Sequence, residues 1–243
     1  MGQASPMIET LCALILAHAL ADFALQSRAM ADGKRKPLLL LAHGSVVFLT
    51  ALACTGVAHP ALVALAVAHM AIDLVKTRTR GGFGAFLADQ AAHGATLLAV
   101  ALWVPDLWVQ GLWADHAALP GLMALAAGTL IATRAGGFAI GLLMAPWADH
   151  IRLDGLPSGG RVIGLLERGL IFGMILGGMP EGIGFLIAAK SVLRFGTVKE
   201  EAKLSEYVII GTLASFAWAM AAALATLALL SALPPLGIPA FPS

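Results

Sequence analysis

Long apolar stretches, separated by short polar or Gly- and Pro-containing segments, run through the whole sequence. Eight of them approach the roughly 20 residues that a helix needs to cross a membrane. Strand-like alternation of apolar and polar positions and Asn-Gly hairpin turns are missing. The pattern therefore predicts an all-α, polytopic bundle of about eight transmembrane helices. The predicted spans are residues 7–27, 37–56, 60–76, 85–104, 119–145, 161–178, 181–195 and 206–232.

Composition agrees with this interpretation and excludes two classes of protein. Of the 243 residues, 59% are hydrophobic and 12% are charged, whereas an ordinary soluble domain has about 25% charged residues. The formal net charge is only +1, so no basic surface for nucleic acid is indicated. The sequence is therefore neither that of a soluble globule nor that of a nucleic-acid-binding protein.

The distribution of basic residues predicts the orientation of the chain. If eight spans alternate, twelve of the fifteen lysines and arginines lie on one side, and none of the other three, Arg134, Arg168 and Lys190, lies in a loop on the opposite side. By the positive-inside rule that side is the cytoplasm, so both termini are expected outside. Trp103, Trp108 and Trp113 are expected in an outer interfacial belt.

The first four predicted spans contain an internal repeat. LAHALADFALQ around His18 matches VAHMAIDLVKT around His69, and LLAHGSVVFLTAL around His43 matches QAAHGATLLAVAL around His93. A duplicated helical hairpin explains this similarity, although chance resemblance among Ala/Leu-rich helices is an alternative. We therefore expect a duplicated unit at residues 1–104 and a second unit of about four spans at 105–243.

Histidine and aspartate recur four residues apart in the repeated spans, a spacing that places both side chains on one face of a helix. All of these groups are expected at one level, in the cytoplasmic half of the membrane. Imidazole with carboxylate suits zinc, with manganese or iron as alternatives, whereas the bland alternative is interhelical hydrogen bonding. The predicted metal-site residues are His18, Asp22, His43, His69, Asp73, Asp89 and His93. Seven candidates exceed the ligands of one zinc ion, so some orient the others or a second ion is present.

Polar residues elsewhere in the sequence are candidates for supporting roles. Gln26, Gln90 and Lys76 lie beside the predicted layer and are expected to orient carboxylates or bind an anion. For Lys76, snorkelling of the side chain to the membrane interface is the alternative. In the second half, the predicted substrate-binding residues for an anionic headgroup are Lys190, Arg194, Glu167 and Arg168. The alternative for this second group is anchoring at the cytoplasmic surface together with an internal Glu/Arg pair.

Several short motifs resemble an uncharacterised bacterial membrane family known as domain of unknown function 3307. The resemblance rests on HALADFALQ (18–26), His43, HMAIDLVK (69–76) and DQAAH (89–93). It is expected to continue through ERG (167–169), AAKSVLRF (188–195) and EYVIIGTLASF (206–216). The resemblance implies a location in the bacterial inner membrane and no particular activity.

The predicted function is that of an intramembrane metal-dependent hydrolase acting on a membrane lipid or another anionic amphiphile. A bound divalent ion would activate water, and Asp22 or Asp89 would act as the general base. A proton- or divalent-metal-coupled transporter is the main alternative. A non-catalytic membrane scaffold and a haem electron carrier, which would leave the aspartates unexplained, are others. Assembly with further copies of the chain is compatible with the sequence.

Overall fold

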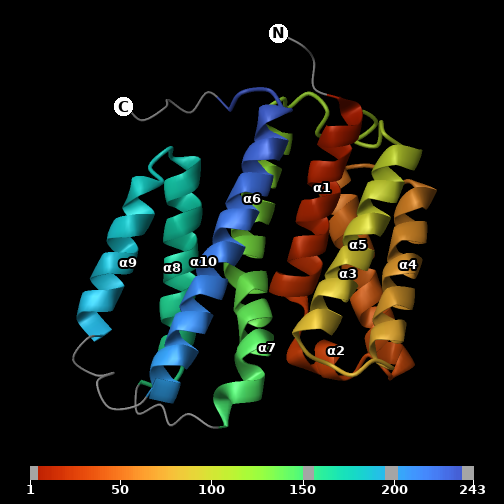
Figure 1. The fold of residues 1–243 in the computed structure, drawn as a ribbon. Helices are drawn as coiled ribbons and strands as arrows, with labels where there is room; N and C mark the ends of the chain where they lie inside the picture. Colours follow the sequence, from red (N-terminus) through yellow and green to blue (C-terminus); the bar gives the residue numbers. More distant parts are fainter. Residues whose placement is uncertain (1–4, 150–155, 195–201, 237–243) are drawn as a thin grey trace. The chain divides into compact units, whose positions relative to one another are not determined.

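The computed structural model describes residues 5–149, 156–194 and 202–236, and within these ranges the regular structure is entirely helical. The all-α class predicted from the sequence is confirmed. The chain forms two compact units, one built from residues up to Leu130 and from Thr226 onward, the other from Ile131 to Ala225. Figure 1 shows the helices of both units. This division differs from the one at residue 104, which stays a prediction.

The first unit contains six α-helices and one π-helical turn, η1, in the described part of the chain up to Leu130. These elements are α1 (Pro6–Leu20), η1 (Ala21–Leu25), α2 (Arg28–Asp32), α3 (Pro37–Thr55), α4 (Pro60–Lys76), α5 (Phe83–Trp103) and α6 (Leu119–Leu130).

Proline and glycine set several helix ends in this unit. Pro6, Pro37 and Pro60 each occupy the first turn of a helix, where the missing N–H costs no hydrogen bond. The ring Nδ1 of His59 accepts a hydrogen bond from the Ala61 N–H at 3.1 Å and so caps α4. Gly56 ends α3 with a left-handed φ of 69°, a conformation that favours glycine.

Helices α1, α3, α4 and α5 form a ring in which each packs on the next and α5 packs back on α1 (Figure 1). Small and aliphatic side chains such as Ala17, Leu62 and Leu97 fill the ring. Trp108, in the segment after α5, is only 1% exposed and joins this core. The prediction of an interfacial belt was therefore wrong for Trp108, because its large apolar ring is more stable packed against these helices.

The second unit contains a π-helical turn and helices that follow it. These elements are η2 (Ile131–Ala135), α7 (Gly136–Ala148), α8 (Gly159–Leu176), α9 (Glu181–Arg194) and α10 (Ala202–Ser231), whose last residues belong to the first unit. A π turn leaves backbone carbonyls without their usual helical partners. Trp218 donates to the carbonyl of Ile131 at 2.8 Å, and Arg168 donates to that of Thr133 at 3.1 Å. These side chains stabilise η2.

All eight predicted spans coincide with helical segments, and within the described residues five segments are long and apolar enough to cross a membrane. These five are Pro6–Leu25, Pro37–Thr55, Phe83–Trp103, Leu119–Ala148 and Lys203–Ser231. The protein therefore has the helices of a membrane protein. That α4, α8 and α9 also cross the membrane, the orientation of the chain and the duplication of the hairpin stay predictions.

Candidate metal centre

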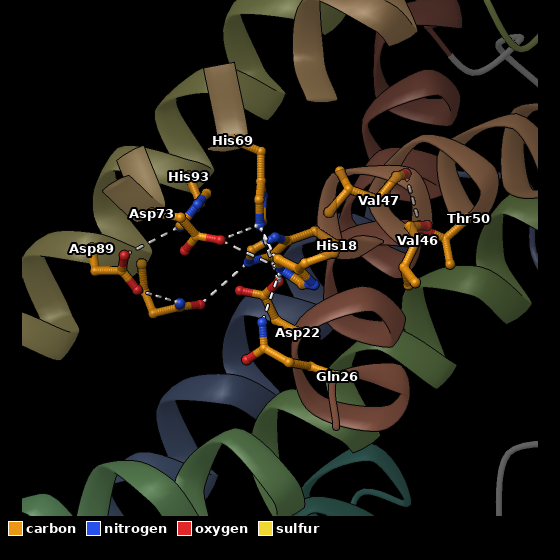
Figure 2. Close-up of polar contacts among 12 residues, drawn as sticks. His18, Asp22, Gln26, Val46, Val47, Thr50, His69, Asp73, Asp89 and His93 are labelled. Carbon is orange, nitrogen blue, oxygen red and sulfur yellow. Dashed lines mark hydrogen bonds and ion pairs between the residues drawn. The ribbon is translucent and has the colours of Figure 1, made fainter. Parts of the chain in front are cut away.

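The seven predicted metal-site residues lie together near one end of the four-helix ring. His18 and Asp22 come from the end of α1 and from η1, His43 from the first half of α3, His69 and Asp73 from the end of α4, and Asp89 and His93 from the start of α5. His43, His69, Asp73, Asp89 and His93 are at most 6% exposed. Figure 2 shows the histidines and aspartates that it labels pointing toward one another. Antiparallel packing thus brings distant parts of the sequence to one place.

The two His-x-x-x-Asp motifs have different backbones. His69 and Asp73 lie on the regular helix α4, whereas Asp22 lies in the π turn η1, four residues after His18 on α1. A π turn widens the helix and changes the direction of the side chains that follow it. In its place at the end of α1, the Asp22 carboxylate reaches both His43 and His69.

Two imidazole nitrogens of this cluster lie close to each other and to one oxygen of each of two carboxylates. The Nε2 atoms of His43 and His69 are 3.0 Å apart. Asp22 Oδ1 lies 3.2 Å and 3.3 Å from these nitrogens, and Asp73 Oδ2 lies 3.5 Å and 3.6 Å from them. Ligands at 2.0–2.2 Å from a tetrahedral zinc ion are separated by about 3.3–3.6 Å, since each edge is roughly 1.63 times the metal–ligand distance. Each carboxylate oxygen, together with the two nitrogens, is therefore spaced approximately as ligands of one small cation would be.

The cluster also collects the buried polar atoms that lack hydrogen bonds. Among the described residues, every buried side-chain nitrogen or oxygen without a hydrogen-bond partner belongs to six of the seven residues. These atoms are His18 Nδ1, Asp22 Oδ1, His43 Nδ1, Asp73 Oδ2, Asp89 Oδ1, His93 Nδ1 and His93 Nε2. Leaving such atoms unsatisfied costs about 1–3 kcal/mol each. A cation that binds several of them would recover much of this free energy.

Two lysines hold the outer oxygens of the carboxylates. Lys34 Nζ donates to Asp73 Oδ1 at 2.5 Å, and Lys76 Nζ donates to Asp89 Oδ2 at 2.6 Å. The inner oxygens, Asp73 Oδ2 and Asp89 Oδ1, remain without hydrogen-bond partners among the described residues. Lys76 thus contacts the Asp89 carboxylate directly, as its expected orienting role requires. Lys34 was missed, because in the GKRK segment between α2 and α3 nothing distinguishes it from its neighbours.

The two glutamines also contact the cluster. Gln90 Nε2 donates to Asp89 Oδ2 at 3.1 Å, and Gln90 Oε1 lies 3.3 Å from His18 Nε2. The Gln26 amide nitrogen lies 2.9 Å from His43 Nε2. An ion bound to this nitrogen of His43 would therefore displace the Gln26 amide.

Three overlapping groups within the cluster could hold a metal ion, each with donor atoms within 4.8 Å of one another. The groups are His18 with Asp22 and His69, His43 with His69 and Asp73, and Asp73 with Asp89 and His93. Together they include all seven predicted residues. Imidazole nitrogens with carboxylate oxygens suit zinc, manganese or iron, but the geometry does not identify the metal.

The residues predicted to bind an anion lie in the second unit. Lys190 Nζ pairs with Glu167 Oε2 at 2.8 Å. Arg168 is 4% exposed and donates to the Thr133 carbonyl and, at 3.1 Å, to Ser215 Oγ. Arg194 ends α9, and its side chain lies outside the described part of the chain. Arg168 thus has structural partners, and the anion-binding role of the group stays a prediction.

Comparison with known protein families supports the resemblance inferred from the motifs. Residues 10–116 match the model of DUF3307, a family described as a protein of unknown function. The matched region contains all seven residues of the cluster together with Lys34, Lys76 and Gln90. It ends before ERG (167–169) and the later motifs, so the expected continuation into the second half is not part of the match. No curated protein and no solved structure matches the chain.

Proposed function

We propose that this protein is a membrane metalloprotein that binds a divalent cation in the first unit, between His43, His69, Asp22 and Asp73. The observation that carries the proposal is the spacing of their donor atoms: the two imidazole nitrogens lie 3.0 Å apart, and each lies 3.2–3.6 Å from one oxygen of Asp22 and one oxygen of Asp73. Two carboxylates and two neutral imidazoles would balance the charge of a divalent ion. Zinc is the metal that we propose, because imidazole and carboxylate are common zinc ligands.

We further propose that the bound ion serves hydrolysis. A zinc-bound water has a pKa near 7 instead of about 15.7, so the ion supplies a nucleophile at neutral pH and polarises the bond to be broken. Because three of the four helices around the centre, α1, α3 and α5, belong to segments that are long and apolar enough to cross a membrane, an amphiphile with a polar anionic end is the substrate class that fits. The protein's own contribution is to hold the ligands within a largely buried cluster.

The arrangement also narrows the choice of general base. Asp22 supplies one of the four converging oxygens, so in an enzyme with a single ion Asp89 is the better candidate. Its Oδ1 is buried and has no hydrogen-bond partner among the described residues. Lys76 and Gln90 hold the other oxygen of the same carboxylate, Oδ2, which directs Oδ1 toward the histidines. A carboxylate held in this way can accept a proton from water.

The metal content of the detergent-purified full chain tests the first part of the proposal. We expect about one or more equivalents of zinc, manganese or iron per chain by elemental analysis, and a loss of at least tenfold in His43→Ala. His116→Ala is the matched control, because His116 is exposed and lies outside the cluster. Wild-type protein that binds none of these metals when they are supplied would refute the metal centre.

A paired assay on the same preparation tests the second part. Hydrolysis of an anionic lipid ester should disappear after chelation and return when the metal is restored. Uptake of a labelled divalent ion into proteoliposomes is measured in parallel, because a transporter would show uptake without hydrolysis. That outcome would replace the hydrolase proposal with the transporter alternative while leaving the metal site intact.

A further inference from the structure

The proposed ligand set of His43, His69, Asp22 and Asp73 leaves part of the cluster unused. Asp89 and His93 lie on α5, are 6% and 1% exposed, and belong to a group with Asp73 whose donor atoms all lie within 4.8 Å of one another. Both ring nitrogens of His93 and Oδ1 of Asp89 lack hydrogen-bond partners among the described residues. A buried imidazole with both nitrogens unsatisfied is costly, and a second ligand would remove that cost.

Resting on the proposed function, we propose that the centre binds a second divalent cation, held by Asp73, Asp89 and His93. Asp73 would serve both ions. The rings of His69 and His93, one from each set, have centroids 4.1 Å apart, so the two sets adjoin. Two-metal hydrolytic sites place their ions about 3.5–4 Å apart, commonly with a shared ligand.

The surroundings of Asp89 orient it for this role. Gln90 donates to Asp89 Oδ2 through Nε2, because a carboxylate only accepts, and this fixes the amide with Oε1 toward His18. Lys76 holds the same Oδ2. Oδ1 is therefore left facing His93, whose Nδ1 lies 3.7 Å away. Partners that fix a ligand in this way are characteristic of metal sites.

A count of charges indicates what would accompany the second ion. Asp22, Asp73 and Asp89 contribute three negative charges, and Lys34 and Lys76 contribute two positive charges through their ion pairs. One divalent ion brings the sum to +1, and two bring it to +3. Such an excess in a buried site requires an anion. A phosphate group, which carries two charges or more and bridges two metal ions, is the substrate chemistry that fits.

With two ions, Asp89 becomes a ligand and no separate carboxylate base is needed. Water held between the ions would lose its proton more readily than bulk water, and both ions would polarise the phosphorus–oxygen bonds of the substrate. Three protein ligands on the second ion leave a coordination position for that water or for a phosphate oxygen.

Metal stoichiometry distinguishes the two sites. Purified full-length protein is equilibrated with Mn²⁺ and inorganic phosphate, and bound manganese is counted by elemental analysis together with electron paramagnetic resonance. We expect two ions per chain with the spectrum of a spin-coupled pair. His93→Gln and Asp89→Asn should each bind one ion with an uncoupled spectrum. The retained ion shows that the variant is folded, and His116→Ala should keep both ions.

Other outcomes separate this inference from the proposed function. One ion per chain in the wild type, unchanged in His93→Gln, would refute the second site and leave the first intact. Loss of both ions in both variants would also refute it, because the residues would then belong to a single site. A wild-type protein that binds no ion would refute the proposed function itself.

Discussion

Asp73 and Asp89 divide their two oxygens between a lysine and the histidines. In each, one oxygen pairs with an ammonium group at 2.5–2.6 Å and the other faces the cluster without a hydrogen bond. The lysines therefore compensate the carboxylate charge in the absence of an ion and direct the free oxygen inward. This arrangement repeats on α4 and α5.

Replacing Lys34 tests that balance. Lys34→Met leaves the Asp73 carboxylate, which is fully buried, without its ion-pair partner, and such a loss costs about 3–5 kcal/mol. We expect this destabilisation in metal-free protein and a smaller one in zinc-loaded protein, because the ion then compensates Asp73. Denaturant unfolding in detergent, with and without chelator, measures both values.

Lys36→Met is the control for this experiment, since Lys36 is exposed on the same segment. An equal loss of stability with and without zinc would mean that the ion does not interact with Asp73. It would count against the metal centre even if Lys34→Met is destabilised.

At the level of single residues the sequence was informative about ligands and poor about their partners. Histidine and aspartate are rare and costly in apolar helices, so their four-residue spacing identified the cluster. Lys34 carried no such signal, because a lysine in a polar turn is ordinarily solvated. Its burial to 7% exposure depends on the packing of α2 against α3 and on the position of α4, which a local pattern does not contain.

At the level of elements, helices α3 and α5 differ in their packing at a place where their sequences are similar. A glycine follows the histidine in both α3 and α5, as His43-Gly44 and His93-Gly94. A Cβ at Gly44 would lie 2.8 Å from Met70 Cγ, whereas one at Gly94 would meet no described atom within 4 Å. Gly44 therefore allows α3 and α4 to approach closely beside His43, and Gly94 has no such function.

This difference predicts opposite effects of the same substitution. Gly44→Ala should be less stable than Gly94→Ala by about 1–3 kcal/mol, the usual cost of overpacking, and should weaken metal binding. Gly94→Ala should be neutral or stabilising by up to about 1 kcal/mol through helix propensity. Unfolding midpoints and metal titrations of both variants provide the comparison. Indistinguishable variants would contradict the close approach at Gly44.

The helices themselves followed from hydropathy and proline positions, but the π turns did not. Ala21–Leu25 reads as a continuation of α1, and the corresponding His-x-x-x-Asp motif on α4 lies on a regular helix without a π turn. What differs is the tertiary setting, in which Asp22 meets His43 and His69. Because helical period is a local property, it could not show this change in the direction of side chains.

At the level of the whole molecule, the orientation in the membrane follows from charge alone and needs an independent test. Arg80 lies between α4 and α5, and Asp115 lies between α5 and α6; both side chains are exposed. In intact bacterial cells, a membrane-impermeant maleimide should label Asp115→Cys but not Arg80→Cys, which should react only after lysis. The reverse pattern would invert the predicted topology.

The native cysteines provide a low background for this labelling. Cys12 is 0% exposed and Cys54 is 7% exposed, so the parent protein should remain unlabelled. The match to DUF3307 ends at residue 116, so the first unit could be interpreted on firmer grounds than the second. The boundary between units near Leu130 lies within a continuous apolar helical stretch, where no composition change could reveal it.

The far end of the four-helix ring is closed. Thr10, at the start of α1, donates to the Pro105 carbonyl at 2.8 Å and accepts from the Trp108 N–H at 3.0 Å. These contacts hold Trp108 and Leu107 within the apolar core on the side away from the histidines. An ion moving along the axis of the ring would have to pass these two large, buried apolar side chains. We therefore expect an ion to reach the centre from the lysine end or between the helices, and not through the end that Trp108 and Leu107 occupy.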